Sequence, residues 1–249
     1  MGFSSRSYAR SYVGLPGFPP GIKWLLISNV GVFLFQWLTA NSEFGRYFNY
    51  YLALVPAEVL RHAALWQLAT YMFLHGGISH ILWNMLSLWM FGSMLEQSWG
   101  TRRFLQLYFF SGIGAGICIV LLSLIFGGTA VPTIGASGAI FGVMLVCAML
   151  WPNQTVLFNF LIPLKLKYMV MIIGAIAFIG AWNPSSGVSN IGHLGGMLFG
   201  YIFMKLPKMR YARFDPVGPV RETYKAWKLA RAKRKFQVYL KKQRSDRIN

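Results

Sequence analysis

A single serine in the stretch TIGASGAIFG, residues 133 to 142, is the residue whose surroundings first suggest chemistry. A serine hydroxyl is a poor nucleophile until a base removes its proton. His193, which lies in a second apolar run, is the candidate base for Ser137. A carboxylate often orients such a histidine, but both aspartates, Asp215 and Asp246, lie in the C-terminal tail. The glutamates lie in the first connection, at the inner end of the second apolar run or in the tail, so none is a candidate. The sequence therefore predicts acyl transfer by a serine–histidine dyad without a carboxylate.

Two further polar residues, His80 and Asn84, could stabilise the negative charge that develops on the carbonyl oxygen during acyl transfer. They are four residues apart and therefore share one face of a helix. The expected donors to this oxyanion are the Asn84 amide, the His80 ring and the backbone N–H of Ser137. Hydrogen bonding between helices would explain any one of these polar residues alone. Together they favour a site, because polar groups at membrane depth are costly unless they are paired or functional.

The residues that carry this chemistry lie in a chain with the composition of a helical membrane protein. Of the 249 residues, 55% are hydrophobic and 12% are charged, against about 25% charged residues in soluble domains. Long apolar runs recur along the chain, and we expect each to form a transmembrane helix. They cover roughly residues 23–40, 79–96, 103–125, 136–151, 167–182 and 190–205. The predicted fold class is an all-α membrane protein, a bundle of six transmembrane helices with a long first loop.

The distribution of lysine and arginine predicts how this bundle is oriented. Basic residues mark the N-terminal segment, the second and fourth connections and the tail, whereas the third and fifth connections carry no charge. By the positive-inside rule, both termini face the cytoplasm. His80, Asn84, Ser137 and His193 then lie at a similar depth near the outer surface, so we expect the active site to open to the outer side. The first connection, residues 41–78, has the apolar spacing of short helices in the membrane interface.

Glycine pairs indicate how two of these helices could approach each other. Gly138 and Gly142 form one pair four residues apart, and Gly196 and Gly200 form another. Small residues at this spacing let helix backbones pack closely, which would bring the serine within hydrogen-bond reach of the histidine. Phe141, on the same helix face as the serine, could stack on the imidazole ring. Simple helix packing also accounts for the glycines.

These motifs together resemble those of the rhomboid family of intramembrane serine proteases, over about residues 24 to 206. Three motifs carry the polar residues: a GxSG at Gly135-Ala136-Ser137-Gly138, an HxxxN at residues 80–84, and an HxxGxxxG formed by His193, Gly196 and Gly200. Three further matches lie around the second helix: Trp66-Gln67, Phe73-Leu74-His75-Gly76, and Glu96 with Gly100. The resemblance implies peptide-bond hydrolysis within or just outside a substrate's transmembrane segment, typically after a small residue. It implies Ser137 as nucleophile, His193 as base, and an oxyanion hole made by His80, Asn84 and the Ser137 N–H. The expected partners are single-pass transmembrane protein substrates and the lipid bilayer, with no cofactor and no metal.

Two positions depart from the family's pattern. Gln67 stands where many members have arginine, which puts the stability of the first loop in question, and Phe141 stands where some have tyrosine. Neither departure removes a catalytic group. The family also includes members that keep the fold and lose the chemistry, so the alternative is a catalytically silent rhomboid-like membrane scaffold or transporter. His75, five residues before His80, is expected to structure the loop or the mouth of the site.

Charge divides the chain into a cytoplasmic N-terminal segment (1–22), the helical protease domain (23–206) and a basic cytoplasmic tail (207–249). The net charge is +18, and of 24 lysines and arginines 15 lie from Lys205 onward. Such a tail enforces the topology and could also bind anionic lipids, at about 1 kcal/mol per basic residue near the surface. No nucleic acid partner is expected. The N-terminal segment lacks the apolar core of a cleavable signal, so we expect a bacterial inner membrane.

Overall fold

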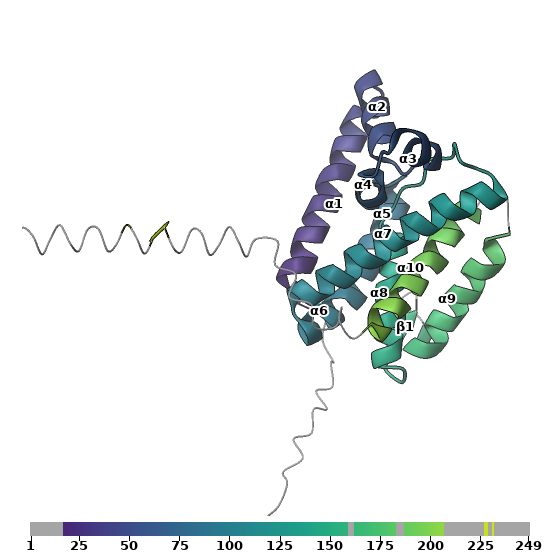
Figure 1. Ribbon diagram of the computed structural model, residues 1–249. Helices are drawn as coiled ribbons and strands as arrows, with labels where there is room; N and C mark the ends of the chain where they lie inside the picture. Colours follow the sequence, from purple (N-terminus) through teal and green to yellow (C-terminus); the bar gives the residue numbers. More distant parts are fainter. Residues whose placement is uncertain (1–16, 159–161, 183–186, 207–226, 229–230, 232–249) are drawn as a thin grey trace, which may run out of the picture. The chain divides into compact units, whose positions relative to one another are not determined.

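The computed structural model describes residues 17–158, 162–182, 187–206, 227–228 and 231, and these residues are predominantly helical (Figure 1). Almost all of the basic tail lies outside the described residues. The expectation that it binds anionic lipids therefore stays a prediction.

Helices make up most of the elements. In chain order these are α1 (Pro20–Thr39), α2 (Glu43–Leu52), α3 (Pro56–His62), α4 (Gln67–Thr70), the 3-10 turn η1 (Tyr71–Phe73), α5 (Ile78–Ser87), the π-helical turn η2 (Leu88–Gly92), α6 (Ser93–Trp99), α7 (Thr101–Phe126), α8 (Ser137–Leu150), the strands β1 (Thr155–Phe158) and β2 (Ile162–Lys165), α9 (Leu166–Gly180) and α10 (Gly187–Lys205).

Helical structure occurs at each of the predicted spans, with α5, η2 and α6 together forming the second. Within the part of the chain that the structure describes, Pro20–Thr39 and Thr101–Ile125 are long and apolar enough to cross a bilayer. Helices α8 and α9 are apolar but have only 14 and 15 residues, which is about 21–23 Å against a hydrocarbon core of roughly 30 Å. The prediction of a helical protein is confirmed, and the number of bilayer crossings stays a prediction.

Two local features differ from the predicted all-α fold. The connection between α8 and α9 is an antiparallel hairpin in which Thr155 pairs with Lys165 and Leu157 with Pro163. Its strands contain the β-branched residues that favour an extended backbone. The second span is interrupted by the π-helical turn η2 rather than being one regular helix. The fold is therefore mostly helical with one short hairpin.

Helices α7, α8 and α10 pack against one another at the centre of the fold (Figure 1). Their close approach depends on glycines that face one another. A Cβ built on Gly196 of α10 would overlap the carbonyl oxygen of Gly138, and one on Gly200 would lie 2.8 Å from the carbonyl oxygen of Gly142. Fully buried side chains pack around these helices, among them Phe104, Leu107, Tyr108, Val143 and Val146.

Glu96, in α6, fixes the N-terminal end of α1. Its carboxylate accepts hydrogen bonds from the backbone N–H groups of Gly21 at 2.7 Å and Ile22 at 2.8 Å, and from the Thr101 hydroxyl. Amides in the first turn of a helix have no partner within the helix, and negative charge is favoured at that end. Glu96 is 3% exposed, and both of its oxygens are used to hold α1 in place.

Gln67 stabilises the first connection, which answers the question raised by the absence of an arginine there. Its side-chain oxygen accepts the N–H of Val55 at 2.9 Å, and its side-chain N–H₂ donates to the carbonyl of Tyr51 at 3.2 Å. Leu54 and Thr133 then exchange two backbone hydrogen bonds of 2.9 and 2.8 Å. The first connection is thereby tied to the segment that leads into α8.

Candidate active site

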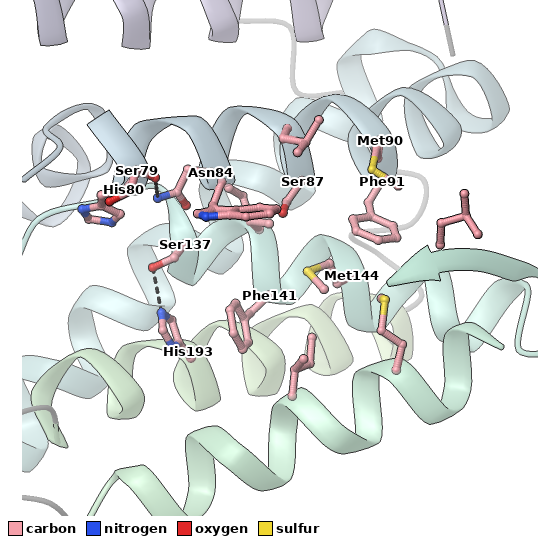
Figure 2. Close-up of a pocket in the computed structure, with 16 residues that line it drawn as sticks. Ser79, His80, Asn84, Ser87, Met90, Phe91, Ser137, Phe141, Met144 and His193 are labelled. Carbon is pink, nitrogen blue, oxygen red and sulfur yellow. Dashed lines mark hydrogen bonds between the residues drawn. The ribbon is translucent and has the colours of Figure 1, made fainter. Parts of the chain in front are cut away.

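Ser137 and His193 meet near the beginnings of two helices. Ser137 is the first residue of α8, and His193 lies in the second turn of α10. Oγ of Ser137 and Nε2 of His193 are 2.8 Å apart and form a hydrogen bond (Figure 2). A neutral imidazole that carries its proton on Nδ1 can accept through Nε2. The pair can therefore generate a serine nucleophile, with the histidine as base.

An aromatic ring holds the imidazole in position. Phe141, one turn after Ser137 on α8, stacks on the His193 ring with 4.1 Å between centroids and an interplanar angle of 6°. The contact is almost parallel, so it restricts rotation of the imidazole out of its plane. Phe141 can thus supply part of the orientation that a carboxylate supplies in a triad.

The described carboxylates are engaged away from this pair. Glu96 is bound to the amides of α1. In the first connection, Glu58 accepts hydrogen bonds from His62 at 2.8 Å and Tyr50 at 2.9 Å, and these hold the pKa of the Glu58 carboxyl below its ordinary value. Glu43 lies in the first turn of α2, where the helix N-terminus favours a negative charge.

His80 and Asn84 lie on α5 and line the same cavity as Ser137 (Figure 2). Asn84 is buried, and its Nδ2 donates to the carbonyl oxygen of His80 at 2.9 Å. This bond uses one of the two N–H groups of the amide. A Cβ built on Gly135 would lie 2.8 Å from Nε2 of His80 and 3.9 Å from Oγ of Ser137, so both atoms lie close to Gly135.

Gly135 and Gly138 leave room for this arrangement. Gly135 has a φ of +125°, which residues with a side chain rarely adopt, and its N–H donates to the carbonyl of Tyr71 at 2.9 Å. The space that a Cβ would occupy there is taken by the His80 ring. A Cβ built on Gly138 would lie 2.7 Å from Cβ of Ala115, so α7 closes the other side.

A cavity of about 420 Å³ extends from the dyad between the α5–η2 segment and helices α8 and α9. Its polar end contains Ser137, His193, His80 and Asn84. The rest is mostly apolar and includes Met90, Phe91, Met144, Leu157, Met169 and Ile173 (Figure 2). Methionine side chains adapt to irregular apolar partners, so the cavity can accept an apolar polypeptide segment with its backbone near the serine.

His75 is buried next to His80, and its backbone hydrogen bond to Gln36 was not predicted. It is 3% exposed, its ring centroid lies 5.1 Å from that of His80, and its backbone N–H donates to Oε1 of Gln36 at 3.0 Å. Gln36 lies on α1, and its Nε2 donates to Oδ1 of Asn49 at 2.7 Å. The sequence signal was a glutamine inside a long apolar run, a position where a polar group needs a partner.

Asn84→Ala should reduce turnover without abolishing it. Removal of one donor to an oxyanion costs about 10²–10³ in rate, and we expect the low end because other donors remain. The measurement is kcat and KM on a reconstituted transmembrane substrate. Asn29→Ala is the matched control, since Asn29 is a buried asparagine of α1 whose Nδ2 also donates to the carbonyl four residues earlier, at 2.8 Å. An unchanged kcat with a raised KM would assign Asn84 to substrate positioning instead.

Comparison with known proteins identifies a family whose matched region includes Ser137, His193, His80 and Asn84. The family model for the Rhomboid domain matches residues 62–207. RHOMBOID-like protein 1 of Arabidopsis thaliana is 35% identical over 173 residues, 67% of this chain and 42% of that protein. RHOMBOID-like protein 2 of the same plant is 34% identical over 188 residues, 73% of this chain and 56% of that protein. Rhomboid protease GluP of Bacillus subtilis (strain 168) is 36% identical over 136 residues, 55% of this chain and 25% of that protein. The matches thus span between a quarter and a little over half of the length of these relatives.

Proposed function

Because this chain belongs to the rhomboid family and is an integral membrane protein, we propose that it is an intramembrane serine endopeptidase. The observation that carries the proposal is the hydrogen bond of 2.8 Å between Oγ of Ser137 and Nε2 of His193. The rhomboid protease among its relatives supports the same reaction class.

In the first step, Oγ of Ser137 attacks the carbonyl carbon of the scissile peptide bond while its proton passes to Nε2 of His193. A carbon–oxygen bond forms, and the carbonyl electrons move onto the oxygen to give a tetrahedral oxyanion. The stacked Phe141 keeps the imidazole plane directed at the serine through this transfer. A base held in advance in this geometry avoids the entropy cost of orientation during the reaction.

Three donors would stabilise the oxyanion. They are the Asn84 amide, Nε2–H of His80 and the backbone N–H of Ser137. The last belongs to the first turn of α8, where backbone amides have no helical partner and the helix dipole favours negative charge. Donors fixed before the reaction in a site that excludes bulk water are the most effective form of charge stabilisation.

Collapse of the tetrahedral intermediate breaks the carbon–nitrogen bond, and His193 returns its proton to the leaving amine. Water then attacks the acyl-enzyme with His193 again as base, which releases the acid product and free Ser137. A second cavity of about 130 Å³ reaches both residues from the side of Tyr71 and Thr133. It is large enough for water, and its polar lining supplies partners for it.

The substrate that fits this site is a single-pass transmembrane protein. The apolar cavity between α5–η2 and α8–α9 matches the side chains of such a segment. We further propose that both termini face the cytoplasm, as the basic residues require, with the site near the opposite surface. The bacterial inner membrane stays a prediction, because the relatives come from both a bacterium and a plant.

A fluorophosphonate probe tests the proposal directly. The activated serine displaces fluoride and forms a covalent phosphonyl ester, which mass spectrometry can locate in the sequence. We expect labelling of the purified, folded chain at Ser137 only, and none after heat denaturation. The same preparation, reconstituted with single-pass model substrates, should cleave at least one of them within or just outside its transmembrane segment. A folded chain that neither labels nor cleaves would be a silent scaffold or a transporter.

A further inference from the structure

The two ring nitrogens of His80 face different surroundings. Nδ1 lies 3.2 Å from the backbone nitrogen of Gly76, in hydrogen-bonding geometry. Nε2 lies on the opposite side of the ring, beside Gly135, the residue two positions before Ser137. The two nitrogens of a neutral imidazole differ in function, since one donates and the other accepts. The partner of Nδ1 therefore decides what Nε2 can do.

Gly76 can only donate through its backbone N–H, so Nδ1 of His80 must be the acceptor in this bond. The proton of the neutral ring then resides on Nε2, on the side of the ring next to Gly135. The other tautomer, and also the imidazolium, would place an N–H on Nδ1 against the N–H of Gly76. Both of those forms lose the hydrogen bond and bring two donors together, so the bond favours the one form that is a neutral donor through Nε2.

A second set of hydrogen bonds fixes the position of the Gly76 N–H. The preceding residue, His75, donates its own N–H to Oε1 of Gln36 at 3.0 Å, and Gln36 is held in turn by Asn49 at 2.7 Å. Gln36 is 8% exposed, so little water competes with the His75 N–H for Oε1 of Gln36. The His75 ring also packs edge-on against the His80 ring, with an interplanar angle of 67°.

We propose that Gln36 and the Gly76 N–H are positioning groups that hold His80 in the Nε2–H tautomer, so that its neutral ring donates to the oxyanion. The proposal rests on the proposed protease function and assigns α1 and the first connection a role in it. Neither Gln36 nor Gly76 touches the reacting atoms. Both act through His80, which lies 44 positions after Gln36 and 4 positions after Gly76 in the chain.

Nitrogen NMR of the whole chain, labelled with ¹⁵N in its histidine rings, reads the tautomer without any need for activity. The chain has four histidines, and the signals lost in His80→Gln identify those of His80. We expect a non-protonated Nδ1 and a protonated Nε2 in the wild type. A protonated Nδ1 in the folded wild type would overturn the proposal, even if the protein cleaves substrates normally.

Gly76→Pro and Gly76→Ala form a matched pair, because proline removes the N–H and alanine keeps it. An alanine Cβ would lie 3.6 Å from Cδ1 of Ile134 and 3.7 Å from Nδ1 of His80, which are ordinary contacts. Proline should lower kcat about 10- to 100-fold, somewhat less than full loss of an oxyanion donor, with KM little changed and Nδ1 partly protonated. Alanine should retain most of the activity and the wild-type NMR pattern. Equal losses in the two variants would contradict the proposal.

Gln36→Leu gives an independent route if the proline variant fails to fold. It leaves the Gly76 N–H in place but removes the acceptor for His75, so it should shift the same His80 signals and lower kcat. A folded Gln36→Leu chain with the wild-type tautomer would contradict the role of Gln36.

A double-mutant cycle separates action through His80 from general damage. His80→Gln places an amide N–H₂ near the position of Nε2, so this donor does not depend on a tautomer. In the His80→Gln background, Gly76→Pro should cause no further loss of kcat, because the effects of substitutions at residues that act through one another do not add. Additive losses would show that Gly76 acts elsewhere. If no variant and no wild type cleaves any substrate, the proposed function fails, while the NMR result still decides the tautomer.

Discussion

We expect the Ser137→Ala variant to fold and insert normally and to show no detectable cleavage of a transmembrane substrate. In the wild type, the Ser137 hydroxyl supplies the oxygen that forms the bond to the substrate, and Nε2 of His193 lies 2.8 Å from that oxygen in a hydrogen bond. Loss of the serine or the histidine of a serine protease costs about 10⁶ in kcat. His193→Ala should therefore be as inactive as Ser137→Ala. The double variant should lose nothing more, because the members of a dyad act as a unit.

Cleavage by purified variants in detergent, followed by gel mobility of the products, measures this effect. Ser123→Ala is the matched control, since Ser123 is a buried serine of α7 whose hydroxyl donates to the carbonyl of Val120 at 2.8 Å. It should cleave at close to the wild-type rate. Cleavage by Ser137→Ala at a rate near that of the control would reject Ser137 as the nucleophile, and another residue would have to carry the reaction.

Sequence reasoning predicted the helices because each is encoded by a local pattern. A continuous apolar run such as that of α7 identifies a helix without knowledge of its neighbours. The hairpin of β1 and β2 was not predicted, since four-residue strands in a connection leave too short a pattern to distinguish them from a loop. The turn η2 was missed for a different reason. Its sequence, LWMFG, is as apolar as the regular helix on either side, and hydropathy does not report hydrogen-bond register.

The candidate site, like the fold, could be predicted from the sequence only in part. Sequence reasoning could propose four site residues, because their side chains are able to carry the chemistry and form short motifs: Ser137, His193, His80 and Asn84. Gly76 could not be assigned a partner from the sequence, because it acts through a backbone N–H and every residue except proline has one. The bond between Gln36 and the backbone of His75 joins residues 39 positions apart. No local pattern encodes such a contact, which depends on how α1 packs against the loop before α5.

Gly196→Val should cause the largest loss among substitutions that leave every catalytic group in place. Even a Cβ at Gly196 would overlap the carbonyl oxygen of Gly138, which follows Ser137 directly. Since that oxygen belongs to the backbone of α8, no rotamer change can relieve the overlap, and α8 and α10 must separate. Overpacking of this kind costs about 1–3 kcal/mol of stability. A displacement near 1 Å between Ser137 and His193 can cost about 10² in rate, so both thermal stability and kcat should fall.

Gly31→Val is the matched control for this substitution. Gly31 lies on α1, and a Cβ built there meets no atom within 4 Å, so the same side chain enters open space. The control should keep its unfolding temperature and its kcat within a small factor of the wild-type values. The decisive measurement is kcat per folded molecule, with the folded fraction taken from thermal unfolding in detergent. If Gly196→Val lowers the unfolding temperature but keeps a normal kcat per folded molecule, the two helices can separate without misaligning the dyad. Gly196 would then stabilise the bundle without positioning the serine against the histidine.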